Sequence, residues 1–259
     1  MNVRAKKHLG QHFLNDQNIA ERIVESLLRE DLPVLEVGPG TGVLTRLLLR
    51  GSRPVRFVEI DAEAAAYLSD TFPDIRGRLI QGDFLSLPLR DIFSTPFSII
   101  GNFPYNISSQ IFFRVLEHRD LIPEVVCMIQ KEVAERIAAP PGSKTYGILS
   151  VLLQAYYDIE YLFTVDEQQF DPPPAVQSAV IRLVRNDVKA LGCNEQLFKQ
   201  VVKTGFNQRR KTLRNSLKVL IGKDCPFHDR AVFDKRPEQL SVQEFIDLTN
   251  LVESCVKTS

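Results

Sequence analysis

The chemistry that this sequence could perform is concentrated in four residues, Asn102-Phe-Pro104-Tyr105, directly after an apolar run that predicts a strand. The lone pair of an exocyclic base amine is delocalised into the ring, so the nitrogen is a poor nucleophile. An amide oxygen of Asn102 and a neighbouring backbone carbonyl could accept its hydrogens and direct the lone pair at an electrophile. Pro104 stiffens the turn, and Tyr105 offers a face on which an extruded base can stack. An ordinary strand-to-helix turn would explain the asparagine and proline but not their placement.

A second group of residues predicts a binding site for a nucleoside-type cofactor. The loop Gly38–Gly42 ends the first predicted strand and lets the backbone turn sharply beside a ligand. Val43 stands where a dinucleotide fingerprint needs glycine, which argues against NAD. Glu59, at the end of the second strand, could accept ribose hydroxyls, and Asp83, after the third, could accept from an adenine amine. Taken singly, a tight turn or a surface aspartate would explain these features.

These residues require a scaffold of alternating strands and helices. Apolar runs predict strands at 33–37, 55–60, 78–81, 97–100 and 125–129, a pattern typical of a doubly wound α/β sheet. Two extended runs, 156–165 and 178–184, flank the sequence FDPPPAVQ and predict an antiparallel hairpin at the sheet edge. From Asn194 the apolar spacing is helical, and Ser241 with Glu244 forms a capping box that opens a final helix. We therefore expect two domains, 1–188 and 189–259.

Composition limits the class of protein. The 259 residues are 44% hydrophobic and 25% charged, and 32 Lys plus Arg balance 32 Asp plus Glu, so net charge gives no support for a nucleic-acid partner. The four scattered cysteines lack metal-ligand spacing and are typical of reduced thiols rather than a zinc site or a disulfide framework. No apolar run approaches the roughly 20 residues of a membrane span. We expect a soluble, cytoplasmic protein.

Positive charge is nevertheless concentrated locally. Residues 199–218 contain several lysines and arginines and no acidic residue, and the N-terminus before the predicted cofactor site is also basic. Such clusters are typical of surfaces that contact phosphates, although a basic run is usually only a solvated helix face. Taken together, the two clusters favour RNA contact by Arg4, Lys6, Lys7, Lys203, Arg209, Arg210, Lys211 and Arg214.

Nearly the whole chain resembles the family of adenine dimethyltransferases that modify small-subunit ribosomal RNA. The strings that carry the resemblance fall in family order and spacing: Gly10–Leu14, Glu36–Gly42, Gly82-Asp83, Gly101–Ser108, Phe170–Val180, Phe206–Ser216 and Arg236–Ser241. The resemblance implies a class I, Rossmann-like S-adenosylmethionine methyltransferase sheet with a small all-α C-terminal domain. It also implies N6 dimethylation of two adjacent adenines by in-line transfer to a flipped base, without a metal.

The same resemblance implies partners and site residues. The partner would be small-subunit ribosomal RNA within a pre-ribosomal small subunit, bound by a monomer during ribosome biogenesis. Cofactor contacts would fall on His12, Leu14, Gly38, Gly40, Glu59, Asp83 and Asn102. Catalysis would rest on Asn102, Pro104, Tyr105 and Phe170, with the rings of Phe170 and Tyr105 clamping the target base.

Three residues depart from the family pattern. His12 replaces the usual asparagine, so its contact carries over only if the backbone makes it. Ala175 and Gln177 replace a lysine and an aspartate in the proline-rich loop, which bears on that loop's RNA contacts.

Three other functions share parts of this pattern. A large-subunit RNA methyltransferase conferring macrolide resistance would share the loop and tetrapeptide, but the strings at 206–216 and 236–241 argue against it. A non-catalytic mitochondrial transcription factor on the same fold is disfavoured by the intact Asn102–Tyr105 and Glu59. A protein-glutamine methyltransferase usually has a second proline in place of Phe103 and lacks the basic C-terminal helices.

Overall fold

The computed structural model describes residues 3–221, 225–227 and 229–258, and the chain divides into two compact units. The first comprises the chain up to Ala134 with Asp158–Arg185, and the second comprises Glu135–Tyr157 with the chain from Asn186. The break after Arg185 lies close to the expected boundary at 188. Residues 135–157, expected in the first domain, cluster with the second because helix α7 (Ile148–Gln154) packs against two later helices, α8 and α11.

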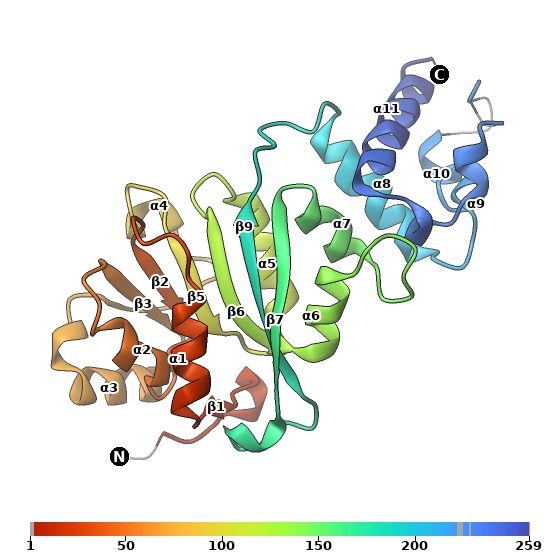
Figure 1. The fold of residues 1–259 in the computed structure, drawn as a ribbon. Coiled ribbons are helices and arrows are strands. Elements are labelled where there is room, and N and C mark those ends of the chain that lie inside the picture. The colour runs from red at the N-terminus through yellow and green to blue at the C-terminus, as the bar shows by residue number, and fades with distance from the viewer. Residues whose placement is uncertain (1–2, 222–224, 228, 259) are drawn as a thin grey trace. The chain divides into compact units, whose positions relative to one another are not determined.

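The first unit is built on a seven-stranded sheet with the order β4-β3-β2-β5-β6-β9-β7 (Figure 1). Its strands are Val34–Val37 (β2), Val55–Glu59 (β3), Leu79–Gln81 (β4), Ser98–Asn102 (β5), Glu124–Gln130 (β6), Tyr157–Val165 (β7) and Ser178–Arg185 (β9). Neighbours from β4 to β6 are parallel, whereas β9 runs antiparallel to β6. All residues of β2 are buried, as expected for a strand covered on both faces. Every expected strand is present, and β9 and β7 are neighbours at the edge.

Helices cover both faces of this sheet; Figure 1 shows α1 in front of it and α5 behind. The helices of this unit are Gln17–Glu25 (α1), Val43–Leu48 (α2), Ala62–Thr71 (α3), Leu89–Ile92 (α4) and Ser108–Glu117 (α5), with 3-10 turns at Lys7–Leu9 (η1), Pro73–Ile75 (η2) and Glu167–Gln169 (η3). Helix α6 (Lys131–Ala138) runs from the first unit into the second. Asp16 and Asp61 begin α1 and α3 by accepting N–H groups of the first turn. None of the helices that the structure describes has both the length and the apolar character needed to cross a membrane.

A small second sheet joins two motifs that are far apart in the sequence. Phe13–Leu14 (β1) pairs antiparallel with Phe170–Asp171 (β8), with Leu14 opposite Phe170. The pairing continues into a bond from the Asn15 N–H to the Gln169 carbonyl, at 2.8 Å. The N-terminal segment is thereby fixed to the beginning of the proline-rich loop.

The second unit is built of helices. They are α7, Glu195–Asn207 (α8), Leu213–Ser216 (α9), Lys218–Ile221 (α10) and Val242–Thr258 (α11), with 3-10 turns at Ala231–Asp234 (η4) and Pro237–Gln239 (η5). The expected capping box is confirmed, because Ser241 Oγ accepts the Glu244 N–H (3.2 Å) while Glu244 accepts the Ser241 N–H (2.8 Å). Tyr146, Phe206 and Phe245 pack ring against ring, with centroids 6.1 and 6.0 Å apart.

The cysteines differ from the sequence expectation. A disulfide joins Cys225 to Cys255, 30 residues later, whereas Cys127 and Cys193 are free thiols. The expectation of reduced thiols is therefore wrong for this pair. Helix α11 packs against α10 and brings Cys255 to a Cα–Cα distance of 5.0 Å from Cys225, within the range that a disulfide spans.

Candidate active site

A pocket opens in the first unit where strands β2, β3, β4 and β5 end, the usual ligand position in a doubly wound sheet. It includes about 930 Å³ of empty space, open solvent included. Nine of the residues assigned from the sequence line it: His12, Leu14, Gly38, Gly40, Glu59, Asp83, Asn102, Pro104 and Tyr105. Phe170 does not.

The glycine-rich loop forms the floor of the pocket. Gly38 and Gly40 have φ values of +70° and +57°, a region that residues with a Cβ rarely adopt. A Cβ on Gly40 would also lie 2.9 Å from the ring of Phe13, so the close approach of β1 depends on this glycine. The loop therefore presents backbone rather than side chains to whatever occupies the pocket.

Glu59 connects the loop to the adjacent strand end. Its carboxylate accepts the Gly40 N–H at 3.0 Å and the Asp61 N–H at 2.9 Å. The side chain is nearly fully buried, and this burial raises its pKa, opposed by the two backbone hydrogen bonds. Each carboxylate oxygen keeps a further lone pair that can accept a ligand hydroxyl. Asp83 lines the same pocket, where one of its oxygens accepts the Leu85 N–H at 2.9 Å.

Glu36 is a pocket residue whose role sequence reasoning did not identify, although it begins the motif Glu36–Gly42. Its side chain is 1% exposed and accepts a 2.7 Å hydrogen bond from Thr45 Oγ1. Burial raises its pKa to about 8; the Thr45 bond opposes this, and the nearby Glu59 charge adds to it. Burial thus favours the neutral form of Glu36, which lies beneath the pocket as a hydrogen-bonding group rather than as a charge.

The Asn102 side chain has a defined orientation. Its Nδ2 donates to the backbone carbonyl of His12 at 2.7 Å, so Oδ1 is the atom that remains to accept hydrogens from a ligand in the pocket. Residue 12 makes this contact through its backbone, so the replacement of asparagine by histidine leaves it intact. Gly101 permits the close packing behind Asn102, because a Cβ there would lie 2.4 Å from the Val37 carbonyl oxygen.

The aromatic ring beside Tyr105 is that of His12. The two ring centroids are 5.3 Å apart, and Nδ1 of His12 donates to the Pro172 carbonyl at 2.8 Å. The Tyr105 hydroxyl is bonded to Ser178 Oγ, and burial raises the pKa of Tyr105. Ser178, the first residue of the expected strand 178–184, is thus a site residue that the sequence did not indicate.

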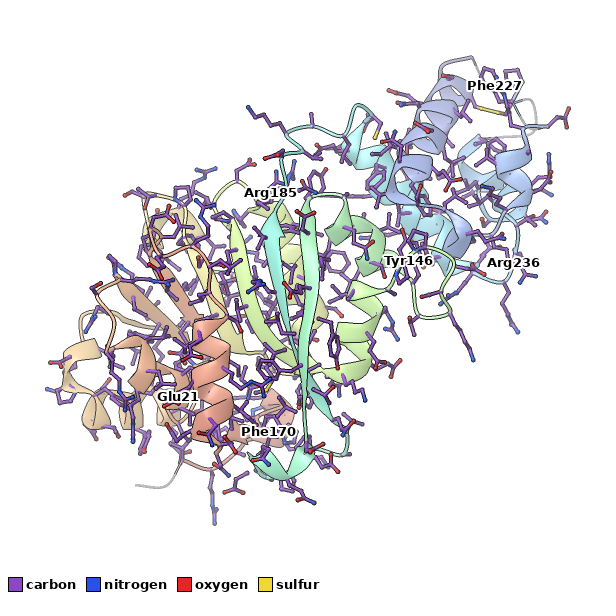
Figure 2. All side chains as sticks on the ribbon, viewed as in Figure 1. Glu21, Tyr146, Phe170, Arg185, Phe227 and Arg236 are labelled. Carbon is purple, nitrogen blue, oxygen red and sulfur yellow. A yellow bond between two sulfur atoms is a disulfide. The ribbon has the colours of Figure 1, made fainter. Side chains whose placement is uncertain are left out.

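Phe170 occupies a different place from the one expected. Its pairing with Leu14 turns the side chain into the hydrophobic core, where it is 3% exposed and packs in one cluster with Val165 and Val180. Figure 2 shows it near the end of the sheet where the β7–β9 connection lies. In this position the Phe170 ring packs in the core and does not line the pocket that Tyr105 lines.

The proline-rich loop contains two residues that depart from the family pattern, and one of them has defined contacts. Gln177 accepts from Lys131 Nζ at 3.0 Å and donates to Asp166 at 2.7 Å. Its amide group uses both its donor and its acceptor to hold the loop in place, so it serves the loop's own structure. Ala175 is exposed.

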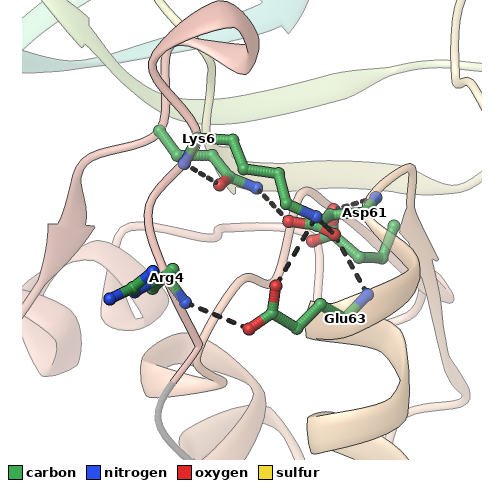
Figure 3. A network of polar contacts seen from close by, with 6 residues as sticks. Arg4, Lys6, Asp61 and Glu63 are labelled. Carbon is green, nitrogen blue, oxygen red and sulfur yellow. Dashed lines mark hydrogen bonds and ion pairs between the residues drawn. The ribbon is translucent and has the colours of Figure 1, made fainter.

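The basic residues of the N-terminal segment differ in their contacts. The Lys6 ammonium is bound to Asp61, a residue whose side chain is fully buried, and lies 3.7 Å from Glu63 (Figure 3). Arg4 donates its backbone N–H to Glu63 at 3.4 Å and exposes its side chain, and Lys7 is exposed. Lys6 thus has an internal partner, whereas Arg4 and Lys7 present their side chains to solvent.

The basic residues of the second unit also differ in their exposure. Arg209 reaches the Ser143 carbonyl at 3.4 Å and lies 3.9 Å from Glu238. Arg214 donates to Asp234 at 2.7 and 3.0 Å. The remaining members, Lys203, Arg210 and Lys211, are exposed.

Comparison with known proteins identifies the family. Residues 2–253 match the model of the family described as ribosomal RNA adenine dimethylase. The chain belongs to this family. It is 61% identical over 259 residues to the ribosomal RNA small subunit methyltransferase A of Bacteroides thetaiotaomicron, covering 99% of this chain and 97% of the relative. It is 58% identical to the protein of that name from Porphyromonas gingivalis, covering 98% and 99% of the two chains.

Solved structures agree with this assignment. A dimethyladenosine transferase from Plasmodium falciparum matches with a TM-score of 0.79 and 25% identity, covering 95% of this chain and 98% of that one. The 23S rRNA methyltransferase ErmE matches with a TM-score of 0.68 and 29% identity, covering 91% and 99%. The expected fold class and reaction class are confirmed. This ribosomal RNA adenine dimethylase is an enzyme that uses S-adenosylmethionine as its methyl donor.

The pocket of this adenine dimethylase fits that donor. The glycine-rich loop presents backbone to the ligand, and the strand-end acids Glu59 and Asp83 line the pocket as hydrogen-bond acceptors. Within the described part of the chain, no group of three or more His, Cys, Asp and Glu side chains is arranged to hold a metal ion.

Proposed function

We propose that this enzyme transfers two methyl groups to N6 of each of two adjacent adenines in small-subunit ribosomal RNA, within a pre-ribosomal small subunit in the cytoplasm. We propose further that it acts as a monomer. Relatives about 60% identical over nearly their full length carry the name small subunit methyltransferase A, which supports the choice of subunit. The large-subunit enzyme ErmE shares 29% identity with this chain.

The donor contacts follow from the pocket geometry. S-adenosylmethionine supplies an electrophilic methyl group on a sulfonium centre. Glu59 accepts the ribose hydroxyls, Asp83 accepts from the adenine amine, and the backbone at Gly38 and Gly40 borders the rest of the molecule. His12 and Leu14 close the pocket from the N-terminal segment. Support for these roles comes from their common position in one pocket and from the acceptor capacity left on Glu59.

Asn102 prepares the target amine for transfer. The observation that carries this proposal is the bond from Nδ2 to the His12 carbonyl, because it assigns Oδ1 as an acceptor for an N6 hydrogen. A backbone carbonyl of the tetrapeptide accepts the second hydrogen, and the nitrogen lone pair is then directed at the methyl group. After the first transfer one N6 hydrogen remains for Asn102 to accept, which permits a second round. Preorganised acceptors of this kind lower the barrier without reorganising during the reaction.

Tyr105 supplies the stacking face for the flipped base. Its hydroxyl is bonded to Ser178 and its ring lies against His12, so its orientation is fixed before the base arrives. Pro104 restricts the turn that holds Asn102 and Tyr105. We assign Phe170 an indirect role, in which its burial beside Leu14 fixes the N-terminal segment against the proline-rich loop.

RNA phosphates are contacted by the exposed basic residues. In the second unit these are Lys203, Arg210 and Lys211, and near the pocket they are Arg4 and Lys7. Arg209 and Arg214 act mainly within their own unit, because both are engaged with neighbouring carbonyl or carboxylate groups. The target bases are reached in splayed-out RNA rather than by groove readout.

The test is methyl transfer to isolated ribosomal particles. Small subunits that lack the modification, large subunits, and protein-free small-subunit RNA are each incubated with the enzyme and labelled S-adenosylmethionine, and the RNA is mapped by mass spectrometry. We expect dimethyladenine at two neighbouring positions in small subunits alone. Label that enters large subunits instead would contradict the proposed substrate.

A further inference from the structure

The N-terminal segment Lys6–Asn15 crosses the pocket and is fixed on both sides of it. On one side Asn102 donates to the His12 carbonyl at 2.7 Å, and Asn106 donates to the His8 carbonyl at 3.1 Å. On the other side His12 donates to the Pro172 carbonyl, and β1 pairs with β8. The segment therefore forms one wall of the pocket and supplies the carbonyl that orients Asn102.

A compact polar contact holds the beginning of this segment. Lys6 Nζ is bound to Asp61 Oδ1, and Gln11 Nε2 donates to Asp61 Oδ2 at 3.2 Å. The side chain of Gln11 also accepts the Lys6 backbone N–H at 2.8 Å. Figure 3 shows Lys6 extending to Asp61 at the start of α3. One buried carboxylate thus binds the segment twice, at Lys6 and at Gln11.

The segment also fits closely against the tetrapeptide loop. Gly10 has a φ of +66°, and a Cβ on it would lie 2.8 Å from Asn106 Oδ1. There is accordingly no room for the segment to approach the loop further. The position of the segment is therefore limited by the contact of Gly10 with Asn106 and by the bonds of Lys6 and Gln11 to the Asp61 carboxylate.

We propose that Lys6 is a positioning residue for methyl transfer: its ion pair with Asp61 holds the N-terminal segment where the His12 carbonyl orients Asn102. This inference rests on the proposed role of Asn102. It removes Lys6 from the RNA-binding residues, since its charge is directed at a carboxylate whose side chain is fully buried. Asp61, which also begins α3 and donates its N–H to Glu59, connects the segment to the donor side of the pocket.

Lys6 and its neighbour Lys7 form a matched pair for the test. Each is changed to methionine, which keeps a long apolar stem and removes the charge. Lys6→Met should lower the single-turnover rate, at saturating donor and saturating small subunits, by about 10–100-fold, because small displacements of reacting groups have effects of this size. Its affinity for small subunits and the salt dependence of that affinity should match wild type. Lys7→Met serves as the contrast for binding: because Lys7 is exposed, this variant should bind small subunits more weakly and with a smaller salt dependence than wild type.

Two further variants separate positioning from general damage. Lys6→Arg keeps a cation that can bond Asp61 and should restore at least half of the wild-type rate. Asp61→Asn should slow the reaction at least as much as Lys6→Met, because it removes the ion pair with Lys6 and also alters the contact with Gln11. Adding Lys6→Met to Asp61→Asn should cause no further loss, because the ion pair is already absent. A Lys6→Met variant with an unchanged rate and a reduced salt slope would overturn the inference. Failure of the wild type to form dimethyladenine would instead overturn the proposed function.

Discussion

Asn102 shows how much of this site is decided by single hydrogen bonds. An amide side chain can face a pocket with its donor or with its acceptor, and only the acceptor can assist an amine in attacking a methyl group. The carbonyl of His12 takes the Nδ2 donor and so leaves the acceptor available. Because the backbone of residue 12 makes this contact, it does not depend on whether histidine or the asparagine of the family pattern stands there.

Glu36 gives a prediction for the dependence of stability on pH. Its pKa is raised to about 8 in the fold by burial, so folding favours the neutral acid. The favourable contribution of neutral Glu36 is fully present below the unfolded-state pKa and is lost as pH rises through the folded one. Across that window the loss is about 1.4 kcal/mol of unfolding free energy per pH unit.

Glu36→Gln removes this titration and keeps a neutral acceptor for Thr45 Oγ1. We therefore expect the variant to gain unfolding free energy relative to wild type as pH rises from 5.5 to 7.5. Urea unfolding at several pH values, without the donor, measures the difference. A difference between the two proteins that stays constant over this range would show that Glu36 ionises normally in the fold.

At the scale of elements, the sequence predicts the features that local residue patterns determine. Each strand of the large sheet coincides with an apolar run, and the loop, the strand-end acids and the tetrapeptide follow those strands directly. The β1–β8 pairing has no local signal, because it joins Leu14 to Phe170 across most of the first unit. The placement of Phe170 depends on that pairing. The sequence likewise does not indicate the ion pair of Lys6, because its partner Asp61 lies 55 residues away. From the sequence, Lys6 is therefore expected to contact RNA.

The pairing of β1 with β8 leads to a prediction about Phe170. Its burial predicts that Phe170→Ala lowers the unfolding free energy by about 3–5 kcal/mol, the usual cost of emptying an aromatic core site. Phe170→Leu fills most of that space without a ring, and we expect it to fold and to yield dimethyladenine as its main product.

Tyr105→Leu is the matched comparison for the product. Base stacking is worth about 1–3 kcal/mol per base, so this variant should release the base early and accumulate monomethyladenine. Nucleoside analysis of the reacted RNA distinguishes the two variants. Accumulation of monomethyladenine by Phe170→Leu as well would mean that Phe170 leaves the core to clamp the base.

For the whole molecule, overall charge was a poor guide to the RNA partner. The chain has a formal net charge of zero, and several of its clustered basic residues are engaged with acidic groups or carbonyls of the protein itself. What remains for phosphate contact is a smaller set of exposed residues. These residues should account for the salt dependence of binding, because neutralised phosphates release counterions.

Arg210 and Lys211 test this division. The double change to alanine should weaken binding to small subunits and reduce the slope of log affinity against log salt concentration by about 1.5–2, the contribution of two phosphate contacts. Arg214→Ala, which loses its bonds to Asp234, should leave that slope unchanged. Filter binding across a salt series measures both. Equal slopes in all three proteins would show that Arg210 and Lys211 are only a solvated surface.

The central claim, that Asn102 accepts the hydrogens of the target amine, is tested most directly by the single-turnover rate of Asn102→Ala. The reaction is followed with saturating S-adenosylmethionine and unmethylated small subunits, so that weaker binding of either cannot limit it. We expect both methylation rounds to slow by ~10²-fold or more, the scale of losing a preorganised catalytic hydrogen-bonding group, with subunit affinity unchanged. A variant that forms dimethyladenine at the wild-type rate would contradict the account.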